Sequence, residues 1–161
     1  MKPDDLSWLR RSFDLAMQSR NAGKHPFAAL VVSADGRVIV ETSNDSRPPG
    51  NPTRHAERVA AARAATLLAP AELAGCTLYT NAEPCAMCAG AIYWCGIGRV
   101  VYGLSETGLL ALTGNDPENP TLSLPCRTVF ASGQRSIEVF GPLLEDEASV
   151  SQQGFWTLAQ G

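Results

Sequence analysis

The sequence has no long apolar run and no excess of positive charge. Its 161 residues include 13 Lys and Arg against 16 Asp and Glu, which gives a formal net charge of -3. A chain of this charge has no general electrostatic attraction to phosphate backbones or anionic membranes, and no stretch approaches the length of a membrane-spanning helix. We therefore expect a cytoplasmic protein that does not associate with membranes, and the charge disfavours a nucleic-acid ligand without excluding one.

Structural disulfide bonds are not expected either. Five cysteines are an odd number, and a chain of this length with 45% hydrophobic residues can bury a core without cross-links. Two of them, Cys85 and Cys88, lie close together in "AEPCAMCAG". Such a pair is typical of a redox disulfide, a structural zinc site, a haem attachment or half of a catalytic metal site. Cys76, Cys95 and Cys126 are expected to be core thiols.

The chain also lacks internal repeats, low-complexity tracts and linkers, so we predict a single domain over residues 1–161. The helical spacing of apolar residues near the start predicts a first helix that ends at Gly23. Two β-branched runs in "FAALVVSADGRVIVETSN" flank an Asp-Gly pair and predict a β-hairpin. Asn51 as cap and Pro52 at the first helical position predict an alanine-rich helix that ends near Pro70.

The second half of the sequence predicts a strand in "GCTLYT", a helix in "PCAMCAGAIYWCG" and a further strand in "GRVVYG". A crossover of this length makes the two strands parallel. Further predicted elements are helices at 105–112 and 127–131, a strand in "SIEVFG", and an amphipathic segment at 144–158. The expected fold class is α/β, with a mixed sheet of about five strands and helices on both faces.

Histidine is scarce, and one of the two histidines, His55, lies in "TRHAER" two residues before Glu57. Together with "PCAMC" this is the H-x-E and P-C-x-x-C signature of zinc deaminases, in which the glutamate is not a metal ligand. A catalytic zinc site has three protein ligands and one open position. The pattern therefore predicts one Zn²⁺ per chain on His55, Cys85 and Cys88, with Glu57 as the catalytic residue.

Helix geometry supports this interpretation. Pro84 in the first turn of its helix would place Cys85 and Cys88 on one face at the amino-terminal end, where free N–H groups stabilise thiolates. His55 and Glu57 do not share a face of a regular helix. Both can face one metal site only if they lie in the first turn of their helix. We therefore expect two helix starts to meet at the ends of the central strands.

The alternatives for the cysteine pair have less support. A thioredoxin-like pair lacks the expected strand at the amino terminus, and haem attachment requires a histidine where Ala89 stands. No further pair of Cys or His is available to complete a closed structural zinc site. The second histidine, His25 in "GKHPFAAL", is interpreted as a structural or pocket-edge residue.

The sequence resembles the cytidine deaminase-like superfamily, in the branch of bacterial guanine deaminases and tRNA adenosine deaminases. The similar segments are "HPFAALVV", "NPTRHAE", "LYTNAEPCAMCAGAIYW" and "GRVVYG". The resemblance implies a three-layer α/β/α fold, a homodimer, and hydrolytic deamination of a small aminated heterocycle. In that reaction zinc activates water, and Glu57 carries the proton to a ring nitrogen and to the leaving amine.

The resemblance also implies which residues contact the substrate. Asn44 would hydrogen-bond it, the Ala56 backbone N–H would be a donor, and Asp116 would recognise a purine, as in guanine deaminases. Asn44 and Asp116 also fit ordinary turn residues. The C-terminal segment, about residues 142–161, would contribute an aromatic residue across a dimer or pack on its own chain. The implied substrate-binding residues are Asn44, Ala56, Phe27, Trp94, Asp116, Phe155 and Trp156.

The substrate expected from this resemblance is guanine, converted to xanthine and ammonia. "GAIYW" resembles guanine deaminases, and the last 18 residues have three acids and no Lys or Arg, unlike the basic end of tRNA-editing members. Ala28 in place of a common glycine and the proline-rich loop from Thr113 to Leu124 leave alternatives open. These are tRNA wobble adenosine, a guanosine-like nucleoside, cytosine or another small aminated heterocycle. A zinc-stabilised binding module without activity is the alternative from another class.

Overall fold

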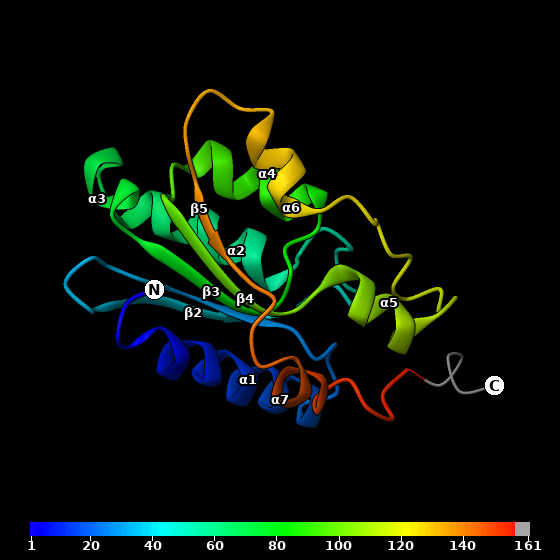
Figure 1. The fold of residues 1–161 in the computed structure, drawn as a ribbon. Helices are drawn as coiled ribbons and strands as arrows, with labels where there is room; N and C mark the ends of the chain where they lie inside the picture. The colour runs from blue at the N-terminus through cyan, green and yellow to red at the C-terminus, as the bar shows by residue number, and fades with distance from the viewer. Residues whose placement is uncertain (157–161) are drawn as a thin grey trace.

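A computed structural model describes residues 1–156 and contains a five-stranded mixed sheet (Figure 1). The strand order is β2-β1-β3-β4-β5. β1 pairs antiparallel with β2 and with β3, whereas the β3–β4 and β4–β5 pairs are parallel, as predicted for the strand-helix-strand unit. The strands are β1 (Ala28–Val32), β2 (Val38–Ser43), β3 (Thr77–Ala82), β4 (Arg99–Leu104) and β5 (Glu138–Phe140).

Helices cover both faces of the sheet, which confirms the predicted three-layer α/β/α class. In Figure 1, α1 and α7 lie on one side of the strands, and α2, α3, α4 and α6 lie on the other. Within residues 1–156 no helix is long and apolar enough to cross a membrane. The helices are α1 (Asp5–Asn21), α2 (Ala56–Leu67), α3 (Pro70–Ala74), α4 (Ala86–Cys95), α5 (Glu106–Thr113), α6 (Cys126–Ala131) and α7 (Glu145–Ser149).

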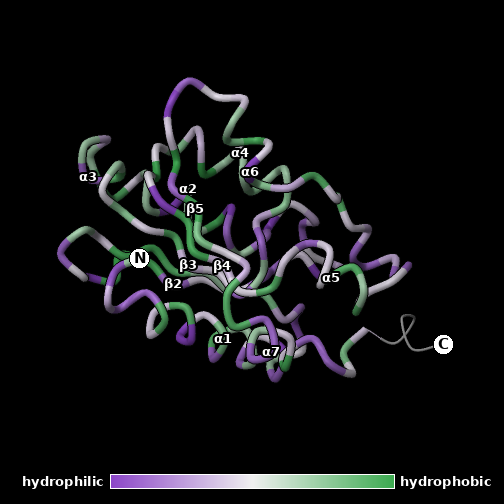
Figure 2. The backbone as a smooth tube through the Cα atoms, viewed as in Figure 1, coloured by the Kyte–Doolittle hydropathy of each residue, from purple (hydrophilic) through white to green (hydrophobic). Residues whose placement is uncertain are grey.

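The central strands form the core. Every residue of β1, β3 and β4 is buried, because helices cover both faces. Neighbouring residues point to opposite faces: Leu30 and Val101 pack in the cluster with α1, whereas Val31 and Val100 pack in the cluster with α2 and α4. Figure 2 shows hydrophobic residues gathered along these strands. The two layers therefore hold the strand ends in fixed positions.

The start of α2 differs from the prediction. The side chain of Asn51 accepts the backbone N–H of Thr53 at 3.0 Å, so the Asn-Pro pair forms a local turn instead of a helix start. The helix begins at Ala56 with His55 as its N-cap, and it ends at Leu67. This later start places His55 and Glu57 on either side of the first helical residue, where both can face one site.

Other details of the sequence prediction were partly confirmed. Cys76 and Cys126 are buried thiols as expected, whereas Cys95 is only half-buried; all five cysteines are free. The last predicted helix is shorter than expected, because α7 has five residues and is followed by turns. The part of the predicted C-terminal segment beyond residue 156 lies outside the described residues.

A buried ion pair joins the start of α1 to the sheet. The Arg99 Nη1 donates to Asp5 Oδ1 at 2.7 Å, and the Tyr79 hydroxyl donates to the same oxygen at 2.7 Å. The Lys2 backbone N–H donates to Asp5 Oδ2 at 2.6 Å. Burial alone would raise the pKa of Asp5, but the Arg99 guanidinium and the other donors lower it to about 2. Asp5 is therefore ionised in the folded protein.

We expect Asp5→Ala to lower the free energy of unfolding by about 3–5 kcal/mol, because the buried guanidinium of Arg99 is then uncompensated. Since the folded pKa of Asp5 lies below its ordinary value, its contribution is complete above about pH 4 and is lost as the pH falls towards 2. Urea unfolding at several pH values measures both effects. Asp14→Ala, an exposed residue of the same helix, is the control. A difference between Asp5→Ala and wild type that stays constant from pH 6 to pH 2 would contradict this assignment.

Candidate active site

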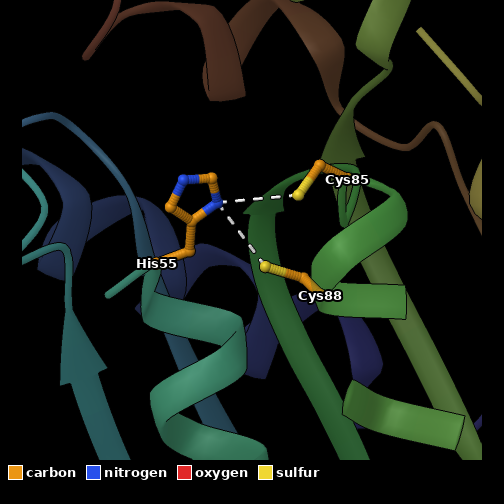
Figure 3. Close-up of side chains that lie close together, drawn as sticks. All are labelled: His55, Cys85 and Cys88. Atoms are coloured by element: carbon orange, nitrogen blue, oxygen red, sulfur yellow. Dashed lines mark hydrogen bonds between the residues drawn. The ribbon is translucent and has the colours of Figure 1, made fainter. Parts of the chain in front are cut away.

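Two helix starts bring three metal-ligand side chains together (Figure 3). His55 is the N-cap of α2, Cys85 is the N-cap of α4, and Cys88 lies in the first turn of α4. The Nδ1 of His55 is 3.6 Å from the Sγ of Cys85 and 3.6 Å from the Sγ of Cys88. Pro84 precedes the N-cap of α4 instead of lying in the first turn, which leaves both cysteines at the same helix end. The predicted meeting of two helix starts is confirmed.

The spacing of these atoms fits a tetrahedral zinc ion. With Zn–N near 2.1 Å and Zn–S near 2.3 Å, a tetrahedron places the nitrogen and sulfur about 3.6 Å apart, which is the separation found for both cysteines. The ligand atoms all lie within 4.8 Å of one another. The hydrogen bond from Cys88 lowers the pKa of the Cys85 thiol to about 4, with a further contribution from His55. One nitrogen and two sulfur donors of this kind suit zinc.

Glu57 lies beside this metal-ligand group. It is the second residue of α2, its side chain is buried, and its Oε1 accepts the Thr80 hydroxyl at 2.9 Å. Its Oε2 lies 3.6 Å from the Sγ of Cys88. Burial raises the pKa of Glu57, and the charge of Cys85 raises it further. Thr80 therefore holds the buried Glu57 carboxyl group beside the three ligand side chains. Glu57 itself does not belong to the metal-ligand group.

The metal-ligand group opens into a cavity of about 590 Å³. Its wall includes His55, Glu57 and Cys85, the first turns of α4 and α5, the segments before β1 and after β2, and residues 117–122 of the proline-rich loop. This volume lies within the range of small-molecule sites. Four of the wall residues are glutamates, and none within residues 1–156 is Lys or Arg.

Comparison with known proteins identifies the family. Residues 2–104 match the family described as the cytidine and deoxycytidylate deaminase zinc-binding region. The chain belongs to this family. It is 42% identical over 154 residues to a probable cytosine deaminase of Schizosaccharomyces pombe, across 94% of this chain and 92% of that one. The protein is therefore a zinc-dependent deaminase.

Guanine deaminases are also similar to this deaminase. The guanine deaminase of Bacillus subtilis is 41% identical over 102 residues, which are 63% of this chain and 65% of that one. The solved guanine deaminase of Nitrosomonas europaea matches with a TM-score of 0.77 at 27% identity, over 97% of this chain and 85% of that one. A solved tRNA:A34 deaminase matches with a TM-score of 0.68, also at 27% identity, over 91% of this chain and 99% of that one.

Two of the substrate residues implied by the resemblance line the cavity of the deaminase. Phe27 and Asn44 both belong to its wall. The Oδ1 of Asn44 accepts the backbone N–H and the hydroxyl of Ser46, each at 2.9 Å. Within residues 1–156 the Asn44 Nδ2 has no hydrogen-bond acceptor, so it is free to donate to a ligand. Ala56 is fully buried at the start of α2, and its N–H is one of the free donors of a helix start.

Trp94 and Asp116 do not belong to the cavity wall. Trp94 lies on the outer surface of α4 with 84% of its surface exposed, packed edge-on against Tyr93. Asp116 is mostly buried, and its Oδ1 accepts the backbone N–H of Glu118 at 3.0 Å. Asp116 therefore shapes its own loop, which is the turn role that the sequence left open. Neither residue lines this cavity, so their predicted contacts with the substrate stay predictions.

Phe155 and Trp156 pack on their own chain behind the cavity wall. Trp156 is buried, and its ring centroid lies 6.1 Å from the ring centroid of Phe27 and 5.1 Å from that of His25. His25 lies in the wall, as its pocket-edge interpretation predicted, and its Nε2 is 2.7 Å from Glu118 Oε2. The two aromatic residues thus support the residues that line the cavity.

Several wall residues were missed by sequence reasoning. Glu83 follows β3 directly, and Glu106 comes two residues after β4. Because the carboxyl ends of neighbouring parallel strands meet at one edge of a sheet, polar residues there are candidates for a site. That rule would have identified both. Glu118 carries no comparable signal, because its place in the wall depends on how the proline-rich loop folds.

Proposed function

We propose that the deaminase removes the exocyclic amine of a free nucleobase, with guanine as the first candidate. The observation that supports this most is the position of Glu57, a buried carboxyl in the wall of the cavity next to the metal-ligand group. A group that moves protons must lie within reach of both the attacking water and the substrate. The position of Glu57 beside Cys88 and in the cavity wall supports both contacts.

The reaction follows from the residues around the cavity. When bound by His55, Cys85 and Cys88, zinc supplies Lewis-acid activation of a water molecule. Glu57 takes a proton from the attacking water, gives it to a ring nitrogen and then delivers a proton to the departing amine. A carbon–oxygen bond forms, the bond from the ring carbon to the amine nitrogen breaks, and ammonia leaves. Thr80 holds the Glu57 carboxyl in place during these transfers.

The character of the wall supports a small neutral base. Phe27, Met87 and Leu109 provide apolar surface for a planar ring, and the Asn44 amide provides a donor for its polar edge. The four glutamates and the absence of Lys and Arg from the wall formed by residues 1–156 disfavour a phosphorylated ligand. This argues against tRNA as the substrate.

Cytosine is the second candidate. The probable cytosine deaminase of Schizosaccharomyces pombe is similar across 94% of this chain, whereas the guanine deaminase of Bacillus subtilis is similar across 63%. Both bases carry an amine on a ring carbon next to a ring nitrogen, so the same residues would act on either. The homodimer also stays part of the proposal, since a second copy would cover the exposed ring of Trp94.

Ammonia release from guanine, guanosine, adenine, cytosine, cytidine and isocytosine tests the substrate. We expect guanine to be turned over, with guanosine and cytidine at least about 100-fold lower in kcat/KM, because a ribose must find room beside the loop at 117–122. Turnover of cytosine in place of guanine would establish the second candidate. Rapid turnover of a nucleoside without its base, or inosine formed in purified tRNA, would exclude the free-base proposal.

A further inference from the structure

Glu106 is a buried acid that the reaction described above does not use. It is the first residue of α5, only 8% of its surface is exposed, and it lies in the cavity wall. Within residues 1–156 no group donates a hydrogen bond to its carboxyl oxygens. Its carboxyl oxygens are not among the fully buried polar atoms without a partner, so they remain accessible in the cavity, where a bound ligand with an N–H group would satisfy them.

The other glutamates of the wall already have partners. Glu57 accepts from Thr80, and Glu118 contacts both His25 and Arg47. Glu83 accepts two backbone N–H groups, one at each carboxylate oxygen. Asp116, the acid that the resemblance assigned to purine recognition, accepts a hydrogen bond within its own loop. Among residues 1–156, Glu106 is therefore the acid of the wall whose carboxyl oxygens have no hydrogen-bond donor.

The backbone at Glu106 is held rigidly. Its N–H donates to Glu83 Oε1 at 3.0 Å, and Ser105 donates its N–H and its hydroxyl to Glu145 Oε2 at 3.1 and 3.0 Å. The Ser105 hydroxyl also caps α5 by accepting the N–H of Gly108. Binding groups on such fixed supports keep their geometry when a ligand enters. The position of Glu106 is thus defined by contacts from the residue that follows β3 and from α7.

Glu106 lines the same cavity as two members of the metal-ligand group, His55 and Cys85. Burial raises its pKa to about 8, together with the negative charges of Cys85, Glu83 and Glu57. Glu106 shares the cavity wall with Cys85 and Glu57, and its backbone N–H donates to Glu83, which lies two residues before Cys85. A ring that enters this cavity for deamination meets a wall to which Glu106 contributes.

We infer that Glu106 is a specificity-determining residue whose carboxyl group hydrogen-bonds a ring N–H of the substrate base. The deaminase then selects aminated heterocycles that carry an N–H on the ring edge facing Glu106. It rejects isomers in which that N–H is blocked by a substituent. This inference rests on the proposed function, because it requires a nucleobase in the cavity. A site built to bond an N–H discriminates strongly against analogues without it.

N-methylated bases test this role, because each methyl group blocks one N–H. We expect wild type to discriminate against one methyl isomer of guanine, or of cytosine if that is the substrate. Glu106→Ala should lower kcat/KM for the parent base about tenfold to hundredfold and change it less than about threefold for that isomer, since the bond is already lost. Glu106→Gln keeps one acceptor oxygen and should show a smaller loss.

Binding provides a readout that does not depend on turnover. In a Glu57→Gln background, calorimetry with the parent base should show that Glu106→Ala weakens binding by about tenfold to hundredfold. Zinc content and melting temperature should match wild type in both Glu106 variants. Glu147→Gln, on an exposed residue of α7, is the matched control and should change neither the binding affinity nor the zinc content.

The outcomes separate this inference from the proposed function. If wild type turns over no base in the panel, the proposed function is wrong and the inference falls with it. If wild type turns over a base and Glu106→Ala still discriminates against the same methyl isomer, the proposed function stands and the inference is wrong. An equal loss for all isomers would assign Glu106 a structural role and would also overturn the inference.

Discussion

Replacing Glu57 by Gln is expected to lower kcat by about 10²- to 10⁴-fold while zinc stays bound. Gln has nearly the same shape as Glu and keeps an oxygen for the Thr80 hydroxyl, which lies 2.9 Å from Glu57 Oε1. It cannot take up and release a proton. Ammonia release measures the rate, and elemental analysis of the purified protein measures zinc.

Glu41→Gln, on an exposed residue of β2 paired with Arg11, is the control and should leave the rate unchanged. A Glu57→Gln variant with the wild-type rate would show that another group moves the proton. Loss of zinc together with activity would mean that Glu57 holds the metal site together. A wild-type protein that binds zinc and deaminates no compound would favour the alternative of a zinc-stabilised binding module.

Replacing Cys88 by Ala is expected to abolish both zinc binding and deamination. Cys88 is buried and provides one of two sulfur atoms that lie 3.6 Å from the His55 nitrogen. Two remaining ligands cannot hold zinc as three do. Zinc should fall from about one ion per chain to a small fraction, and added zinc should not restore activity.

Cys95→Ala is the matched control for Cys88→Ala. Cys95 lies on the same helix but is only half-buried and does not belong to the metal-ligand group. It should keep the zinc content and the rate of wild type. A Cys88→Ala protein that retains a full complement of zinc would show that the ligand set is wrong.

Much of the fold could be predicted because its signals are local. The Asp-Gly hairpin and the strand-helix-strand unit each depend on residues that are adjacent in sequence, and both were confirmed. The start of α2 was not predicted correctly, since an Asn-Pro pair can begin a helix or close a turn. Asn51 forms the turn because its side chain bonds Thr53, and no local rule decides between these two outcomes.

The metal-ligand group could also be predicted, because its two motifs are short and local in the sequence. The cavity wall could not be predicted in this way. Trp94 lies on α4 nine residues after Cys85, and at 100° per residue this is the opposite side of the helix. A motif that includes both residues therefore does not place them in one site. The roles of Glu106 and Glu118 depend on contacts between distant segments, such as the bond between Glu118 and His25.

The two oxygens of Glu83 have a consequence for how such enzymes diversify. One accepts the N–H of Glu106 and the other accepts the N–H of Cys126, so both ends of a 21-residue segment, 106–126, are fixed to the residue that precedes Pro84 and Cys85. A segment closed in this way can change in length and composition at a small entropic cost. Evolution can therefore rebuild the loop that selects the substrate while the metal-binding helix start stays in place.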